Sequence, residues 1–213
     1  MEREEYKRKA IHISMGLWAF YPLLVTKYPA LLICVIFLML VLFVFRKHRW
    51  KAAFDVMARP EDYSYGYLMG PLIYILAVMF CVGCYPPYIA AASFAIMAFG
   101  DGFATIVGRN FGKHQYWYSD KSFEGSVAFF GVAFVLTVVV LRVLAWVITF
   151  EGLNTDMYYL AQISLIGSVC GAVIETLPFE KLRKGGIIGR ALIDDNFFVP
   201  VISGLVMSLY VIL

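Results

Sequence analysis

Charged residues are scarce in this sequence. Asp, Glu, Lys and Arg together make up 15% of the 213 residues, whereas 62% of the residues are hydrophobic. A soluble core of this size cannot bury so much apolar surface, so the composition excludes an ordinary soluble globular domain. It predicts instead a single integral membrane domain over residues 1–213. Each charge inside an apolar run then needs a physical reason for its place.

Cysteine and histidine are also few, with 4 and 3 copies. Cys81 and Cys84 have C-x-x-C spacing, but no second pair and no histidine accompany them, so the sequence does not predict a thiolate metal centre. A P-loop is absent, because the segment Gly108–Lys113 has a different spacing and follows no predicted strand. The net charge of +3 does not indicate a nucleic-acid partner, since the basic residues are spread over separate connections.

Long apolar runs divide the chain into segments that can cross a bilayer. A helix of about 17–25 residues covers the roughly 30 Å of hydrocarbon. The sequence therefore predicts an all-α, polytopic membrane helix bundle with about seven transmembrane helices. The predicted spans are 10–26, 29–45, 67–84, 87–108, 124–150, 157–178 and 197–213.

The basic residues predict the orientation of this bundle. All but two of the 18 Lys and Arg residues lie before the first predicted span or in alternate connections, the exceptions being Lys27 and Arg142. The positive-inside rule then places the N-terminus and the charged connections in the cytoplasm and the C-terminus outside. The membrane is either the cell membrane or that of the endoplasmic reticulum, and the sequence does not distinguish them.

Asp101 stands inside the apolar run 98–105. A carboxylate at membrane depth is costly, so Asp101 is a candidate functional residue. Small residues recur every four positions around it, at Gly100, Ala104 and Gly108, and this spacing favours close helix packing. The acidic side of the helix is therefore predicted to be a close-packing side as well.

Further acids lie at the same predicted depth. Glu175 ends the sixth predicted span, and the last span opens with two aspartates and an asparagine. One acid there can cap the helix N-terminus, but capping does not require two. Mg²⁺ takes one or two carboxylates together with phosphate oxygens. The candidate metal ligands are Asp101, Glu175, Asp194, Asp195 and Asn196.

Cationic and polar side chains lie in the loops beside these acids. Lys and Arg stabilise charge on a transferring phosphoryl group, so the pattern outlines a polyphosphate site. Lys9 and His12 share a side of the first helix and can reach this site, although an interfacial packing role for His12 is an equal alternative. Residues 121–124 could also be a charged helix entry with Ser122 or Asp120 as its cap. The candidate nucleotide-binding residues are Arg109, Asn110, Lys113, Lys121, Ser122, Glu124 and Lys184.

The ordered set of motifs resembles the polyprenol kinase family. This family includes dolichol kinase, phytol kinase and the CTP-dependent diacylglycerol kinase of fungi, and it is related to the phosphatidate cytidylyltransferases. The resemblance covers nearly the whole chain in motif order, but the first three spans match only weakly beyond the opening motif. The segments that carry it are Arg8–His12, Gly100–Ala104, Gly108–Gly112, Lys121–Ser126, Glu175–Pro178 and Asp194–Asn196 with Pro200.

The resemblance implies an integral membrane kinase that uses CTP and Mg²⁺ to phosphorylate a lipid alcohol from the cytoplasmic face. The acceptor would be a polyprenol such as dolichol, a phytol-like isoprenoid alcohol or diacylglycerol. Asp101 or Asp195 would orient or deprotonate the hydroxyl group. The implied catalytic residues are Asp101, Glu175, Asp195 and Lys121, and the implied phosphate-facing cations are Arg109, Lys113 and Lys121.

Two other functions remain open at this point. A phosphatidate cytidylyltransferase is similar around the Gly-Asp and Lys-Ser-x-Glu-Gly elements, but its longer acidic and glycine-rich stretch before the last span is absent here. An ion-coupled transporter would also place carboxylates in helices, although nearer the bilayer midplane. The sequence does not indicate the oligomeric state.

Overall fold

The computed structural model describes residues 2–151, 153–179 and 193–212. This part of the chain is helical, and its strand-like feature is an isolated bridge between Gln115 and Ser122. The α-helices are α1 (Glu2–Ser14), α2 (Lys27–Met39), α3 (Lys51–Met57), α4 (Asp62–Tyr65), α5 (Met69–Cys84), α6 (Pro87–Ala95), α7 (Gly102–Phe111), α8 (Phe123–Val147), α9 (Met157–Glu175) and α12 (Asp195–Ile212). The 3-10 helix η1 (Met15–Leu23) and the π-helices η2 (Leu40–Val44) and η3 (Ile96–Asp101) lie between them.

Five helical runs in the described residues are long and apolar enough to cross a membrane. The apolar helix α5 is shorter, at 16 residues. These helices support an integral membrane protein, whereas the count of seven spans is not confirmed and the orientation of the termini stays a prediction. The five runs are Lys27–Val44, Pro87–Phe111, Phe123–Val147, Met157–Glu175 and Asp195–Ile212.

The first predicted span, 10–26, is divided between two helices. α1 ends at Ser14, and the chain continues as the 3-10 helix η1, which contains Pro22. Proline has no N–H to donate and its ring clashes with the preceding turn, so a regular α-helix does not continue through this segment. η1 also packs closely on the core, because a Cβ added to Gly16 would lie 2.6 Å from the ring of Phe99.

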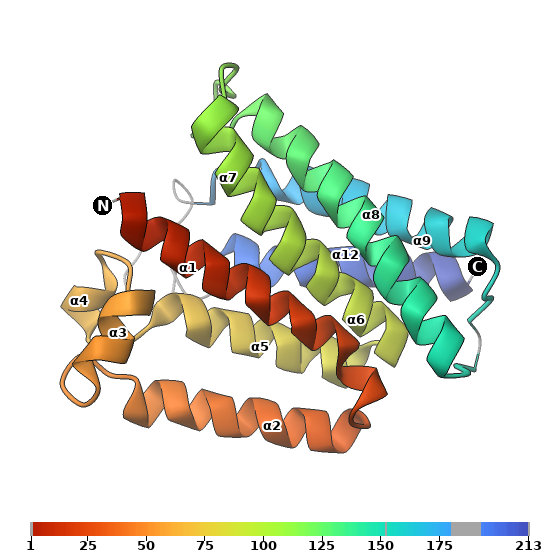
Figure 1. Cartoon of the computed structure of the whole chain (residues 1–213), viewed down its shortest axis with the longest axis horizontal. Helices are drawn as coiled ribbons and strands as arrows, with labels where there is room; N and C mark the ends of the chain where they lie inside the picture. The colour runs from red at the N-terminus through yellow and green to blue at the C-terminus, as the bar shows by residue number, and fades with distance from the viewer. Residues whose placement is uncertain (1, 152, 180–192, 213) are drawn as a thin grey trace.

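The helices lie alongside one another, and the two termini lie at opposite ends of the bundle (Figure 1). α3 and α4 lie at the same end as the N-terminus. The run α6–η3–α7 forms the centre, since every residue of α6 from Tyr88 to Ala95 is buried. α8 packs against α7, and α9 packs against both α8 and α12. The core therefore surrounds the run that ends in the predicted site.

Glycines allow α7 and α8 to cross at close range. A Cβ added to Gly125 would lie 3.0 Å from the carbonyl oxygen of Ala104 and 3.4 Å from the Cα of Gly108. A Cβ on Gly100 would lie 2.8 Å from the ring of Phe129. The predicted close-packing side of this helix is thus confirmed. This crossing brings the loop before α8 next to the acidic end of η3.

Candidate active site

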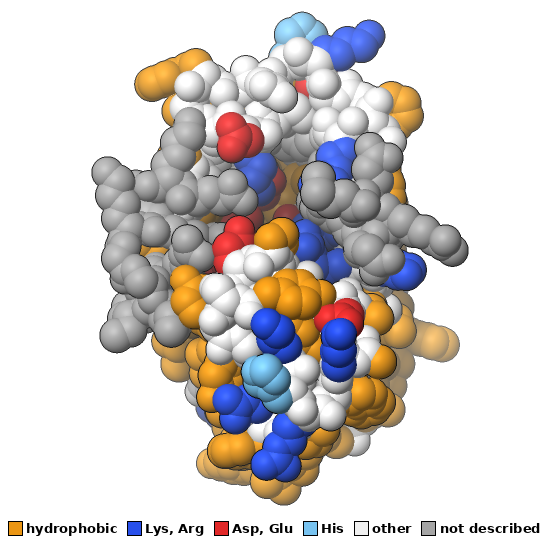
Figure 2. Space-filling model, turned by 90° about the vertical axis from the view of Figure 1, so that its left-hand side faces the viewer, with side chains coloured by type: hydrophobic (Ala, Val, Ile, Leu, Met, Phe, Trp, Pro, Cys, Tyr) orange, Lys and Arg blue, Asp and Glu red, His pale blue; other side chains and the backbone are white. Residues whose placement is uncertain are grey.

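A cleft of about 1100 Å³ opens at the end of the bundle that carries the N-terminus. Figure 2 looks onto this end and shows acidic and basic side chains gathered around a hollow. The walls come from α1, the α3–α4 connection, η3 and α7, the loop before α8, and the facing ends of α9 and α12. The charged residues that line it include Lys9, Arg59, Asp101, Lys121, Glu175 and Asp195.

Asp101 is held from the side of α1. Its Oδ2 lies 2.6 Å from the Nζ of Lys9 and 3.3 Å from the Nε2 of His12, and Asp101 is 7% exposed. Both α1 residues therefore reach the site, as predicted. The Lys9 ammonium ion stabilises the carboxylate in surroundings where an unpaired charge would be costly.

The backbone at Asp101 is unusual. Asp101 is the last residue of the π-helix η3, and α7 begins at the next residue, Gly102. π-helical turns are rare and frequently occur at functional sites, where the wider turn redirects a side chain. The sequence did not predict this turn. Its position, within an otherwise regular apolar helix, supports a functional role for Asp101.

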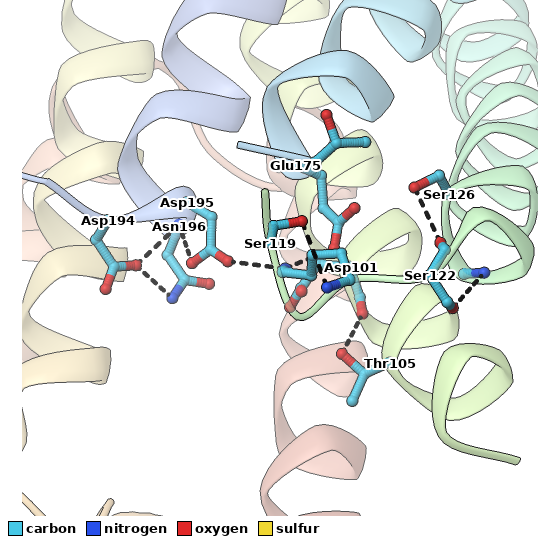
Figure 3. Close-up of polar contacts among 12 residues, drawn as sticks. Asp101, Thr105, Ser119, Ser122, Ser126, Glu175, Asp194, Asp195 and Asn196 are labelled. Carbon is cyan, nitrogen blue, oxygen red and sulfur yellow. Dashed lines mark hydrogen bonds and ion pairs between the residues drawn. The ribbon is translucent and has the colours of Figure 1, made fainter. Parts of the chain in front are cut away.

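Lys121 joins two further carboxylates in the cleft. Its Nζ donates to Glu175 Oε1 at 2.6 Å and to Asp195 Oδ2 at 3.3 Å. Burial by itself lowers the pKa of Lys121, but the negative charges of Asp195 and Glu175 outweigh it and raise the pKa above its ordinary value. Lys121 therefore stays positively charged at neutral pH. Figure 3 shows Glu175, Asp195 and Asp101 converging from three helices.

The loop that carries Lys121 is fixed on both sides. The Oγ of Ser122 accepts the backbone N–H of Gly125 at 3.1 Å, so Ser122 is the N-cap of α8. Before it, the backbone N–H of Tyr116 donates to the carbonyl of Lys121 at 3.0 Å. Ser122 also lines the cleft, so its predicted cap role and its place at the site are compatible.

The two aspartates at the start of α12 divide their roles. Asp194 is 1% exposed, and its Oδ1 accepts both the backbone N–H and the side-chain amide of Asn196, at 2.9 and 2.8 Å (Figure 3). This is the bond pattern of a helix cap. Asp195 also accepts the backbone N–H of Asn196, through Oδ1 at 3.1 Å, but its Oδ2 reaches Lys121 in the cleft. The cap that the sequence allowed is therefore made by Asp194, while Asp195 faces the site.

Not every predicted residue faces the cleft. Among the described residues, Asn110 lies on the exposed surface and accepts the hydroxyl of Tyr6 at 3.1 Å, and Glu124 pairs with His114 at 2.7 Å. Neither of them lines the cleft, and Lys113 does not line it either. Lys184 lies outside the described residues. The predicted residues that do line the cleft are Asp101, Glu175, Asp195, Asn196, Lys121, Ser122, Arg109 and Lys9.

Arg59 lines the cleft but was not among the predicted site residues. It enters from the α3–α4 connection, and its Nη1 lies 3.6 Å from Asp194 Oδ2. The available signal was the polar segment 59–63 between two apolar runs. From the sequence, that segment could cover a nucleotide or simply turn the chain, and only the fold brings Arg59 next to the start of α12.

The carboxylates of the cleft suit a hard cation in chemistry. Within the described residues, no three His, Cys, Asp or Glu side chains are already grouped as metal ligands. Lys9 and Lys121 pair with these acids instead. However, the second oxygen of Glu175, Oε2, is buried and has no hydrogen-bond partner among the residues that the structure describes. A buried oxygen of this kind has coordination capacity to spare, so the residues fit the predicted Mg²⁺, which stays a prediction.

Comparison with known proteins finds relatives that share one description. The phytol kinase of Synechocystis sp. is 37% identical over 144 residues, which is 64% of this chain and 52% of the relative. A probable phytol kinase 3, chloroplastic, of Glycine max is 30% identical over 217 residues, 97% of this chain and 63% of the relative. The phytol kinase 1, chloroplastic, of Arabidopsis thaliana is 30% identical over 138 residues, 62% of this chain and 40% of the relative.

The chain covers only part of the length of each relative. In each of the three, the chain spans less than two thirds of the length of the relative. No family model and no solved structure matches the chain. The relatives nevertheless agree with one another and with the ordered motifs. The chain is therefore similar to phytol kinases, which is consistent with a member of the polyprenol and phytol kinase family.

Proposed function

We propose that the protein is a lipid-alcohol kinase that transfers the γ-phosphate of CTP to the hydroxyl group of an isoprenoid alcohol of the phytol type. The observation that carries the proposal is the cleft in which carboxylates and ammonium groups alternate, from Lys9 and Asp101 to Glu175, Lys121 and Asp195. Phosphoryl transfer depends on positioning and on stabilising negative charge, and this arrangement supplies both. The phytol kinases among its relatives support the same reaction class.

The donor nucleotide binds through the cationic wall of the cleft. Lys121 keeps its charge at neutral pH, and Arg109 lines the same space. Charge-assisted hydrogen bonds from such groups to phosphate oxygens are about twice as strong as neutral ones. Because Lys121 touches both Glu175 and Asp195, a bound phosphate group lies beside two carboxylates.

Mg²⁺ is the ion that we expect between these carboxylates and the donor phosphates. Glu175 and Asp195 would hold it, and Glu175 offers an oxygen that is unpaired in the described structure. When bound, the ion would neutralise charge on the phosphate oxygens. Asn196 contributes by fixing Asp194 at the start of α12.

Asp101 orients the acceptor alcohol. It lies on the central helical run, whereas Asp195 lies at the start of a helix and already contacts Lys121. Lys9 keeps Asp101 ionised, so the carboxylate accepts the hydroxyl hydrogen. The alcohol oxygen then bonds to the γ-phosphorus, the bond from that phosphorus to the bridging oxygen breaks, CDP leaves, and the hydroxyl proton passes to Asp101.

The cleft opens on the cytoplasmic side of the membrane in this proposal. It lies at the end of the bundle that carries the N-terminus, and most Lys and Arg residues belong to connections at that side of the predicted topology. CTP arrives from the water, and the long apolar body of the alcohol stays in the bilayer while its hydroxyl group enters the cleft sideways.

The test uses protein purified in detergent with Mg²⁺ and CTP or ATP labelled in the γ- or α-phosphate. The acceptors are phytol, geranylgeraniol, dolichol, diacylglycerol and phosphatidate. We expect γ-label from CTP in the phosphate ester of an isoprenoid alcohol, and none with the variant Asp101→Asn. An α-labelled lipid made from phosphatidate would indicate a cytidylyltransferase instead. Absence of any labelled lipid would refute the kinase assignment and leave ion-coupled transport to be measured in liposomes.

A further inference from the structure

The guanidinium group of Arg59 has hydrogen-bond donors to spare. In the part of the chain that the structure describes, it pairs with Asp194 at 3.6 Å, which is longer than a hydrogen bond. Among the described residues, this group makes no hydrogen bond, although a guanidinium carries five N–H donors. The side chain is 28% exposed and lines the cleft. Arg59 therefore presents unused donors to the space where the donor nucleotide is proposed to bind.

The backbone around Arg59 is built to hold it in place. Asp62, which is 1% exposed, accepts the backbone N–H of Arg59 at 2.8 Å and that of Met69 at 3.1 Å. These two bonds hold Arg59 close to the start of α5. The guanidinium lies against Gly70, where a Cβ would come within 3.8 Å of its Nε. A cation fixed in this way loses little conformational freedom when it binds a ligand.

The charges around Arg59 favour an anion that carries several negative charges. Burial alone lowers the pKa of Arg59, but the carboxylates of Asp194 and Asp195 raise it overall, so the guanidinium stays charged. Lys121 approaches the same start of α12 from the loop before α8. A planar guanidinium binds two oxygens of a phosphate group at once, whereas an ammonium ion acts as a point charge. The two cations together suit a chain of phosphates better than a single one.

We propose that Arg59 binds the phosphate chain of the donor nucleotide, together with Lys121, and exchanges its long contact with Asp194 for direct hydrogen bonds to phosphate oxygens. This assignment rests on the proposed function in one respect, namely that the ligand of the cleft is a nucleoside triphosphate. It adds to the site a residue on the α3–α4 connection, outside the motifs that line the other walls.

The test compares Arg59→Gln and Arg59→Lys with the control Arg49→Gln, because Arg49 is an exposed arginine nearby on the chain. Direct binding of labelled CTP and CMP to the detergent-purified protein is measured without any lipid. Arg59→Gln removes the hydrogen bonds from the guanidinium to the charged phosphate oxygens, so it should weaken CTP binding about 10- to 100-fold. Arg59→Lys should lie between this variant and the wild type, and CMP binding and the KM for the alcohol should change about twofold at most.

Several outcomes separate this role from a structural one. If Arg59 only anchors α12 through Asp194, the glutamine variant will lower the unfolding temperature and weaken CTP and CMP equally, which overturns the proposal. Unchanged CTP binding overturns it as well, and so does a wild-type protein that binds no nucleoside triphosphate. If the wild type binds CTP through Arg59 but phosphorylates no alcohol, the proposed function fails while the role of Arg59 stands.

Discussion

Replacing Lys121 by Met separates the electrostatic role of this residue from its role in transfer. Its ammonium group lies 2.6 Å from Glu175 and 3.3 Å from Asp195, and the Glu175 side chain is 4% exposed. Removing one partner of a fully buried ion pair costs about 3–5 kcal/mol. Because the Lys121 side chain is 32% exposed, solvent screens part of this effect, and we expect a loss of about 1.5–3 kcal/mol.

A second variant supplies the control. Lys121→Met combined with Glu175→Gln removes both charges of the closest pair, so most of the lost stability should return. Transfer of labelled phosphate should stay absent, because the cation that faces the donor phosphates is still missing. The assay is the unfolding temperature in detergent, followed by tryptophan fluorescence, alongside the transfer rate of the same samples. Recovery of transfer in the double variant, or full activity in Lys121→Met, would refute the reasoning.

Asp101→Asn removes the group that accepts the hydroxyl proton, so it should lower the transfer rate at least about 100-fold with little change in CTP binding. An equal loss of transfer and of CTP binding would contradict this. Gly125→Ala should destabilise the protein by about 1–3 kcal/mol because its methyl group meets the Ala104 carbonyl at 3.0 Å, whereas Gly131→Ala, with open space around it, should not. Ser122→Ala should lower the unfolding free energy by about 1 kcal/mol through loss of the α8 cap, measured by denaturant titration. Folding raises the pKa of Lys121, so the stability that the Lys121 charge contributes is complete below the ordinary pKa of lysine and is lost only as the pH rises through the raised value. Unfolding temperatures should therefore show no titration of Lys121 between about pH 6 and 9.

The apolar runs of the sequence predicted the five described helical runs that are long and apolar enough to cross a membrane. A run of this length and hydrophobicity forms a membrane-spanning helix independently of the helices that pack against it. The details that depend on packing were not predictable. The first predicted span is divided between the end of α1 and the 3-10 helix η1, which contains Pro22. The π-helix that ends at Asp101 has no signature in hydropathy.

The site was predicted best where charge conflicts with an apolar environment. Asp101 and Glu175 stood out because burying a carboxylate is costly, and both are buried in the cleft. Loop residues carry no such conflict. Glu124 was expected at the nucleotide but pairs with His114, and Arg59 was missed because the bonds of Asp62 that place it form only in the folded chain.

The most direct test of the account is the fate of the two labelled phosphates of one CTP molecule. Wild-type protein and the Asp101→Asn variant are incubated with phytol, Mg²⁺ and CTP that carries distinguishable α- and γ-labels. We expect γ-label alone in phytyl phosphate from the wild type, α-label remaining in CDP, and no labelled lipid from the variant. Lipid that carries the α-label, or equal transfer by the Asp101→Asn variant, would contradict it.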